Sequence, residues 1–362
     1  MVLKNLFKVA LVCMSIFVIA CESIEEDSSS LVVEESTQKL NVLATTPMLA
    51  EYVRQIGNDN IDLNILMPYS ADPHSFEASP QDAKKIADAD LVFYIGLKYE
   101  SAGVVEMLEN SVSSEGILIE IGSNIDPIEF SEEGNDDHEG NDDHEADNDH
   151  EGHGHGIYDP HFWFDPIRVS KAVEVIKDEL VKNDSANENS YKSAATNFVT
   201  ELQLLDENIS AMFNTIPAEN RKIITTHEAL GYLEAKYEIE VLTTIIPSLN
   251  SEDSITPKSL KRAIDIIEEH NIKVMFLEAE SSSQYSEVIE QETGIKLISG
   301  LWVETLQENQ SYLNWLENNV AIIVDNLSKE VYEDHDDDHD DDDHDDDDHD
   351  DDHDEDHDDD KD

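Results

Sequence analysis

Strand-like and helix-like patterns alternate along most of this chain, and this alternation restricts its fold more than any other feature. Short apolar runs at residues 40–45, 61–67, 91–95 and 117–121 are separated by polar or helix-like stretches. Strands that alternate with helices form parallel sheets with helices packed on their faces. The sequence therefore predicts an α/β fold.

A second set of alternating elements follows residue 222, after one long helical stretch. Helices are expected at 47–56, from 80 and at 166–181 in the first set; the second set has strands at 222–225, near 241, at 272–277 and at 296–298, and helices from 228 and at 257–269, 285–293 and 310–327. The stretch at 188–213 would form a helix about 39 Å long. We expect two lobes, each with a mainly parallel sheet flanked by helices, joined by this long connecting helix.

The N-terminus has the features of an export signal. Lys4 and Lys8 precede an apolar stretch at 9–20 that is too short to span a bilayer. Residues 18–21 (VIAC) resemble a bacterial lipobox, in which the cysteine is acylated and becomes the first residue. The resemblance implies lipidation at Cys21 and an extracytoplasmic protein anchored to the cell membrane, on the periplasmic or cell-surface side. The alternative is an uncleaved transmembrane anchor with an incidental cysteine.

The chain is very acidic, with a formal net charge of −63 from 22 Lys and Arg against 85 Asp and Glu. This balance argues against nucleic acid and anionic membrane surfaces as partners and favours cations. Much of the acid lies in two low-complexity segments, at 131–156 and from 333 to the end. Such segments cannot build a core, so we expect a disordered insertion at 122–156 and a disordered tail at 329–362.

Four of the 15 histidines lie outside the acidic segments. His270 ends a predicted helix, where a cation suits the helix dipole, and is interpreted as solvated. His74, His161 and His227 lie in loops beside strands and helices, where open α/β sheets bind their ligands. Neutral imidazole is the commonest metal ligand, so a metal site competes here with ordinary surface histidines. Since Zn²⁺ favours about four ligands, three histidines lack one partner.

Three loops resemble the ligand loops of the zinc/manganese-specific solute-binding proteins of ABC transporters. They are residues 72–80 (DPHSFEASP), 159–166 (DPHFWFDP) and 226–232 (THEALGY), in that family's order. The likeness runs from about Leu40 to Leu327 and includes the long helix and a His-rich acidic insertion. It implies two lobes, one metal between them, and a partner permease and ATPase.

The resemblance implies that His74 and His161 are ligands from the first lobe and that His227 is a ligand from the second. Relatives selective for Mn²⁺ usually have Glu at the third position. Histidine there points to Zn²⁺, because Zn²⁺ accepts imidazole more readily than the harder Mn²⁺ does.

The fourth ligand departs from the family's pattern. The family usually has Asp in a segment like residues 300–306 (GLWVETL), and the matching residue here is Glu304. Its extra methylene extends the carboxylate, so the loop must compensate or the site is less tightly coordinated. Glu278 and Glu280 are the alternative fourth ligands, and a solvated carboxylate is the competing interpretation of Glu304.

The histidines of the acidic segments suggest weak metal collection. The insertion would form a low-affinity metal loop with the residues His138, His144, His150, His153 and His155. Tethered weak sites raise the local Zn²⁺ concentration near a tight site. In the tail, where Asp dominates, cation buffering and plain solvation are equally consistent with the composition.

The expected organisation is a lipoprotein signal peptide (1–20), a flexible tether (21–38), an N-terminal lobe (39–183), a connecting helix (184–215), a C-terminal lobe (216–328) and the tail. We expect a monomer that captures Zn²⁺ as the substrate of an ABC importer, and no enzymatic activity. Three rivals are a Mn²⁺ or Fe²⁺ importer subunit, a secreted zinc hydrolase, and a sequestering or adhesive surface lipoprotein. The hydrolase would need an open coordination position and a general base, and the chain has no HExxH motif.

Overall fold

The computed structural model describes residues 39–69, 71–130, 158–246, 248–249, 255–280 and 285–328. The predicted signal peptide, tether and tail lie outside the described residues. So do Cys21, residues 131–157 of the insertion and all five histidines of the predicted low-affinity loop.

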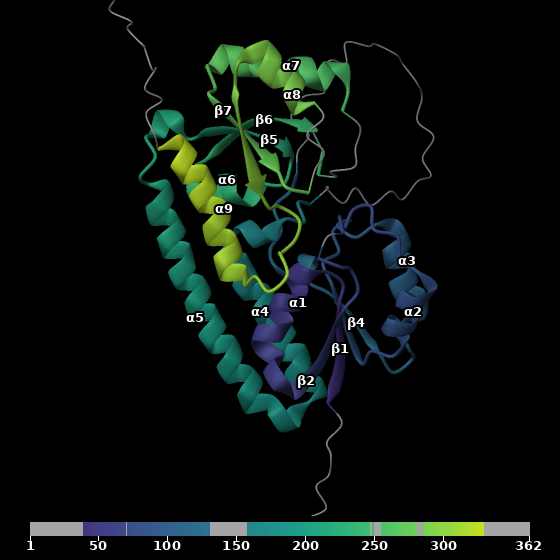
Figure 1. The fold of residues 1–362 in the computed structure, drawn as a ribbon. Coiled ribbons are helices and arrows are strands. Elements are labelled where there is room, and N and C mark those ends of the chain that lie inside the picture. Colours follow the sequence, from purple (N-terminus) through teal and green to yellow (C-terminus); the bar gives the residue numbers. More distant parts are fainter. Residues whose placement is uncertain are drawn as a thin grey trace, which may run out of the picture. The chain divides into compact units, whose positions relative to one another are not determined.

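The first set of strands forms one parallel sheet (Figure 1). Its strands are β1 (Leu40–Ala44), β2 (Ile61–Ile65), β3 (Leu91–Tyr94) and β4 (Ile117–Glu120), in the order β2-β1-β3-β4. Val42 and Ala44 of β1 belong to the main hydrophobic core, whereas Leu43 points into a second cluster on the other face. A central strand buried on both faces explains the continuous apolar run that marks it in the sequence.

Helices cover both faces of this sheet. Helices α1 (Pro47–Gly57) and α4 (Pro166–Asn183) pack into the main core, and α2 (Pro80–Ala87) and α3 (Ala102–Ser111) pack into the second cluster. Helices α1, α2 and α4 each begin at a proline that follows a capping residue: Thr46, Ser79 and Asp165. Proline suits the first helical position because the nitrogen there has no partner within the helix.

Helix α3 was not predicted. Its segment contains Gly103 and the β-branched pair Val104 and Val105, which weaken the local helical signal. Tertiary packing compensates, because Val104 and Leu108 are fully buried in the second cluster. The side chain of Ser101 also caps the first turn by accepting a hydrogen bond from the Val104 amide.

The second set of strands pairs in parallel as well. Strand β5 (Lys222–His227) pairs with β6 (Glu240–Ile246), and β7 (Val274–Glu278) pairs with β8 (Lys296–Leu301). Strands β5 and β7 lie side by side, and the amide of Glu278 donates to the Thr226 hydroxyl. The helices of this part are α6 (Gly231–Tyr237), α7 (Pro257–His270), α8 (Ser286–Thr293) and α9 (Tyr312–Leu327). The prediction of an α/β fold with parallel sheets is confirmed.

Helix α5 (Glu188–Phe213) has the predicted bounds and packs against α1, α4 and α9 (Figure 1). Its buried residues repeat every three or four positions, as an amphipathic helix requires: Tyr191, Ala195, Phe198, Leu202, Leu205, Ile209 and Phe213. They join the core cluster that also holds residues of β1 and β8. Within the described ranges, no helix is both long and apolar enough to cross a membrane.

Three predicted boundaries were wrong. The helix expected from Glu228 begins at Gly231, because β5 continues to His227 and residues 228–230 form a turn. Strand β8 continues past 298 to Leu301. The insertion expected from residue 122 starts later: residues 122–130 are folded, with a 3-10 helix at Gly122–Asn124, a buried Ile125 and a bridge from Glu129 to Tyr158.

Candidate metal centre

Four buried side chains from distant parts of the chain converge: His74, His161, His227 and Glu304. Each offers one ligand atom, and these four atoms all lie within 4.8 Å of one another. His74 lies between β2 and α2, His161 precedes the 3-10 helix Phe162–Phe164, and His227 ends β5. Glu304 lies between β8 and α9.

The Glu304 carboxylate faces all three imidazoles. Its Oε1 lies 3.6 Å from Nε2 of His74, 3.4 Å from Nε2 of His161 and 2.8 Å from Nε2 of His227. Among the described residues, none of the three Nε2 atoms and neither Glu304 oxygen has a partner in hydrogen-bonding geometry. Buried polar atoms are rarely left without partners, so this group is suited to a bound cation.

Two of the imidazoles are oriented by a carboxylate on their other nitrogen. Nδ1 of His161 is 2.8 Å from Asp159, and Nδ1 of His227 is 2.7 Å from Glu278. Each carboxylate also accepts the backbone N–H of the same histidine. Such pairing fixes the tautomer with the proton on Nδ1 and leaves the lone pair of Nε2 directed at the centre.

The Asp-Pro-His sequence occurs in two of the site loops and has the same local structure in both. The Asp72 carboxylate accepts the His74 amide at 2.9 Å, as Asp159 accepts that of His161 at 2.8 Å. This role of the aspartates was missed at the sequence level. The repeated tripeptide was the signal that could have revealed it, because an Asp side chain readily bonds the backbone two residues on.

The backbone around Glu304 is held by side chains from several elements. The Tyr99 hydroxyl donates to the Glu304 carbonyl at 2.9 Å, and the Trp163 indole donates to the Val303 carbonyl at 2.8 Å. The Tyr99 ring also packs edge-on against His74. Tyr99 was not predicted as part of the site, and nothing in its local sequence marks it.

The two alternative fourth ligands have other contacts. Glu278 holds the His227 imidazole, as described above. Glu280 accepts backbone N–H groups of the segment that carries Glu304. His270 is exposed at the end of α7, as predicted.

Electrostatics couple the four side chains. Burial lowers the pKa of His161, but Glu304 and Asp159 outweigh burial and raise it to about 9. Burial also opposes the charged form of His227, yet Glu278 and Glu304 hold its pKa well above the usual value. Burial by itself would raise the pKa of Glu304, whereas His161 and His74 keep it well below its usual range. A divalent cation can replace the protons that these imidazoles carry.

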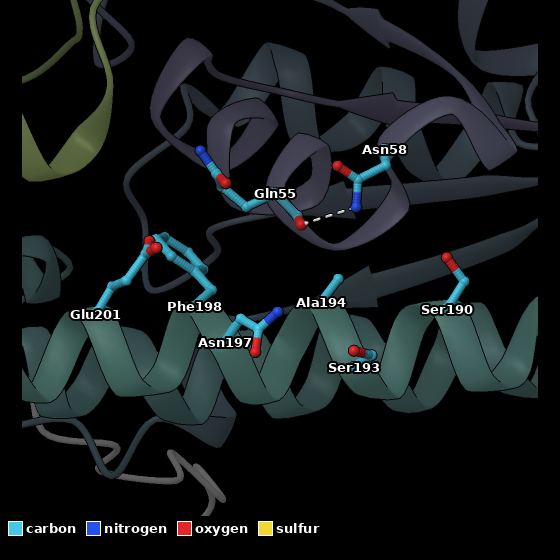
Figure 2. A pocket seen from close by; sticks show the side chains of 8 residues that line it. All are labelled: Gln55, Asn58, Ser190, Ser193, Ala194, Asn197, Phe198 and Glu201. Atoms are coloured by element: carbon cyan, nitrogen blue, oxygen red, sulfur yellow. Dashed lines mark hydrogen bonds between the residues drawn. The ribbon is translucent and has the colours of Figure 1, made fainter.

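A separate pocket of about 450 Å³ lies between the end of α1 and α5 (Figure 2). Amide and hydroxyl groups and one carboxylate provide its polar atoms, and its lining comprises Gln55, Asn58, Ser190, Ser193, Ala194, Asn197, Phe198 and Glu201. None of these side chains is an imidazole or a thiol. The pocket therefore offers no comparable set of metal ligands.

Residues 42–326 match the family described as zinc-uptake complex component A, periplasmic (ZnuA). The chain belongs to this family. The zinc uptake protein ZnuA of Bacillus subtilis is 30% identical over 296 residues, which cover 80% of this chain and 88% of that protein. The manganese ABC transporter substrate-binding lipoprotein PsaA of Streptococcus anginosus is 27% identical over 322 residues, which cover 87% of this chain and 96% of that protein.

Solved structures share the fold of this ZnuA-family chain. The periplasmic zinc-binding protein TroA from Treponema pallidum has a TM-score of 0.70 at 20% identity and covers 81% of this chain and 100% of its own. A Mn-bound periplasmic metal-binding protein from Candidatus Liberibacter asiaticus has a TM-score of 0.68 at 23% identity and covers 80% and 100%. The predicted two-lobe architecture is confirmed by this likeness.

Membership of the ZnuA family establishes the general function. The chain is a metal-binding substrate-binding protein of an ABC transporter, not an enzyme, and such proteins work with a permease and an ATPase. Its relatives are extracytoplasmic, and their names divide between zinc and manganese.

Proposed function

We propose that the transported metal is Zn²⁺, bound by His74, His161 and His227 through Nε2 and by Glu304 through its carboxylate. The convergence of these four buried donors is the observation that carries the proposal. Binding would bring together loops of both lobes around one ion, which the chain then delivers to its permease.

The donor spacing supports a tetrahedral ion. Donors about 2.0–2.1 Å from one Zn²⁺ lie about 3.3 Å apart in a regular tetrahedron. The three Nε2 atoms lie 2.8–3.6 Å from the Glu304 oxygen, which brackets that value. Small shifts of these side chains are enough to place all four donors around Zn²⁺.

The donor chemistry supports zinc over manganese. Three imidazole nitrogens and one carboxylate suit Zn²⁺, whereas Mn²⁺ favours sites richer in oxygen. The zinc uptake protein of Bacillus subtilis, at 30% identity, agrees with this choice. A Mn²⁺ importer subunit is the second candidate, because relatives such as PsaA are named for manganese.

We further propose that a lipid on Cys21 anchors a monomeric chain to the membrane, and that the His-rich insertion binds Zn²⁺ weakly. The PsaA relatives are named lipoproteins, which agrees with the VIAC sequence at residues 18–21. The imidazole and carboxylate content of residues 131–156 supports the weak sites. An adhesive role has no specific observation in its favour.

Competition between the full chain and a high-affinity chelator tests the metal assignment. We expect one tight Zn²⁺ per chain and Mn²⁺ binding that is weaker by orders of magnitude. The chelator keeps free metal so low that weak sites in the acidic segments do not register. Equal or tighter binding of Mn²⁺ would favour the second candidate.

Replacement His161→Ala tests the ligand set in the same assay. Loss of one of four ligands should weaken Zn²⁺ binding by orders of magnitude, because the remaining three donors leave one position to water. The exposed His270→Ala is the matched control and should bind like the parent. A His161→Ala chain with the parent's affinity would show that the ligands lie elsewhere.

A further inference from the structure

One carboxylate beside the metal centre bonds to the backbone that carries a proposed ligand. Glu280 follows β7 by two residues, and its Oε1 accepts the amides of Val303, Glu304 and Thr305 at 3.1, 3.1 and 3.3 Å. Its second oxygen lies 3.2 Å from the Val303 amide. Three consecutive N–H groups therefore converge on one side chain.

The segment that carries Glu304 has left the sheet, so side chains must satisfy its backbone groups. Asn319 of α9 bonds both the N–H and the carbonyl of Trp302. The next two carbonyls are bound by Trp163 and Tyr99. Glu280 accepts the next three N–H groups, and an unbound N–H in this partly buried place would be costly.

We propose that Glu280 is a positioning residue of the metal centre: by gripping the backbone at 303–305, it holds the Glu304 carboxylate opposite the three imidazoles without binding the ion. This inference rests on the proposed function. The Glu280 carboxylate is engaged by backbone donors, so it acts on the metal through Glu304. Outer partners of this kind typically change metal affinity by about 10- to 100-fold.

Two substitutions separate reach from charge. Glu280→Gln removes the charge but keeps an oxygen at the same distance, so it should retain Zn²⁺ affinity within about threefold by keeping its hydrogen bonds. Glu280→Asp keeps the charge but shortens the side chain by one methylene, so it should weaken binding by about 10-fold or more. Glu308→Ala, an exposed glutamate in the same loop, should match the parent.

The measurements are chelator competition for Zn²⁺, the visible spectrum of the Co²⁺-loaded chain and circular dichroism, all on the full chain. We expect Glu280→Gln to give the parent's Co²⁺ spectrum, since no ligand has been replaced. The inference is wrong if Glu280→Asp binds like the parent, or if Glu280→Gln loses affinity while Glu280→Asp keeps it. Lack of a tight site in the parent itself would count against the proposed function instead.

Discussion

His161 and His227 each lie between two carboxylates, and this arrangement controls how protons compete with metal. One carboxylate meets Nδ1, and Glu304 approaches Nε2. In the metal-free chain, both imidazoles keep a proton at neutral pH, because their pKa values are raised. Metal binding must expel protons that an ordinary histidine, with a pKa near 6.5, would mostly have lost already.

The affinity for Zn²⁺ should therefore rise with pH up to about 9, the pKa of His161, and level off above it. A metal-free chain should show the opposite trend. The stability that protonated His161 contributes is complete below about pH 6.5 and is lost as the pH rises through about 9. Titration calorimetry at pH 7 in two buffers of different ionisation enthalpy measures the released protons. A binding heat independent of the buffer would contradict this pattern.

The length of Glu304 matters because its backbone is held from several sides. Glu304→Asp shortens the side chain while the Tyr99 and Glu280 hydrogen bonds keep the backbone in place. The carboxylate then retreats from the imidazoles, and Zn²⁺ affinity should fall by about 10-fold or more, a change typical of a disturbed metal site. Chelator competition measures this. Tighter binding by Glu304→Asp would mean that the loop moves to compensate.

At the scale of elements, the four proposed ligands sit at the ends of regular structure or in the loops between elements. His227 closes β5, and His161 lies a few residues before α4. Neighbouring elements lock these positions: the Tyr232 hydroxyl of α6 donates to the Asp159 carbonyl at 2.7 Å. A Cβ on Gly231, at the start of α6, would lie 2.7 Å from the Asp159 carboxylate. The close approach of α6 therefore helps to fix the carboxylate that orients His161.

Helix α5 contributes to stability rather than to metal chemistry. Leu202→Ala removes a fully buried side chain from the core, and the free energy of unfolding should fall by about 2–5 kcal/mol. Leu204→Ala on the same helix is the control: Leu204 is 55% exposed, so the change should be within about 0.5 kcal/mol. Urea denaturation measures both. Equal effects of the two substitutions would contradict the described face of α5.

At the scale of the whole molecule, the proposed ligands lie between residues 74 and 304 and come from both sets of strands. They cannot meet in an unfolded chain, so Zn²⁺ binds the folded state and stabilises it. Free Zn²⁺ at about 1,000 times Kd should add about 4 kcal/mol to the free energy of unfolding.

Thermal unfolding with and without Zn²⁺ measures this linkage. The parent's Tm should rise with the metal, and the rise should be largely lost in His161→Ala. The His270→Ala control should keep it. A Tm of the parent that is insensitive to Zn²⁺ would be incompatible with a tight site in the folded chain.

Local sequence patterns were sufficient to predict most elements. Apolar periodicity and the Thr, Ser and Asp caps placed α1, α2 and α4, and the bounds of α5 agree with its periodicity. These signals act over a few residues, so a single chain displays them directly. Helix α3 lacks a strong local signal and depends on the burial of Val104 and Leu108, so the sequence did not reveal it.

The three histidines and Glu304 could be chosen from the sequence because they lie in loops with recognisable motifs. Their partners could not. Asp159 and Glu278 hold the imidazoles, Glu280 grips the loop, and Tyr99 reaches a carbonyl 205 residues away along the chain. Glu278 and Glu280 follow the same strand and differ in role only because successive residues point in different directions. Which carboxylate faces the imidazoles depends on how the sheets and loops pack, and only the folded chain specifies that.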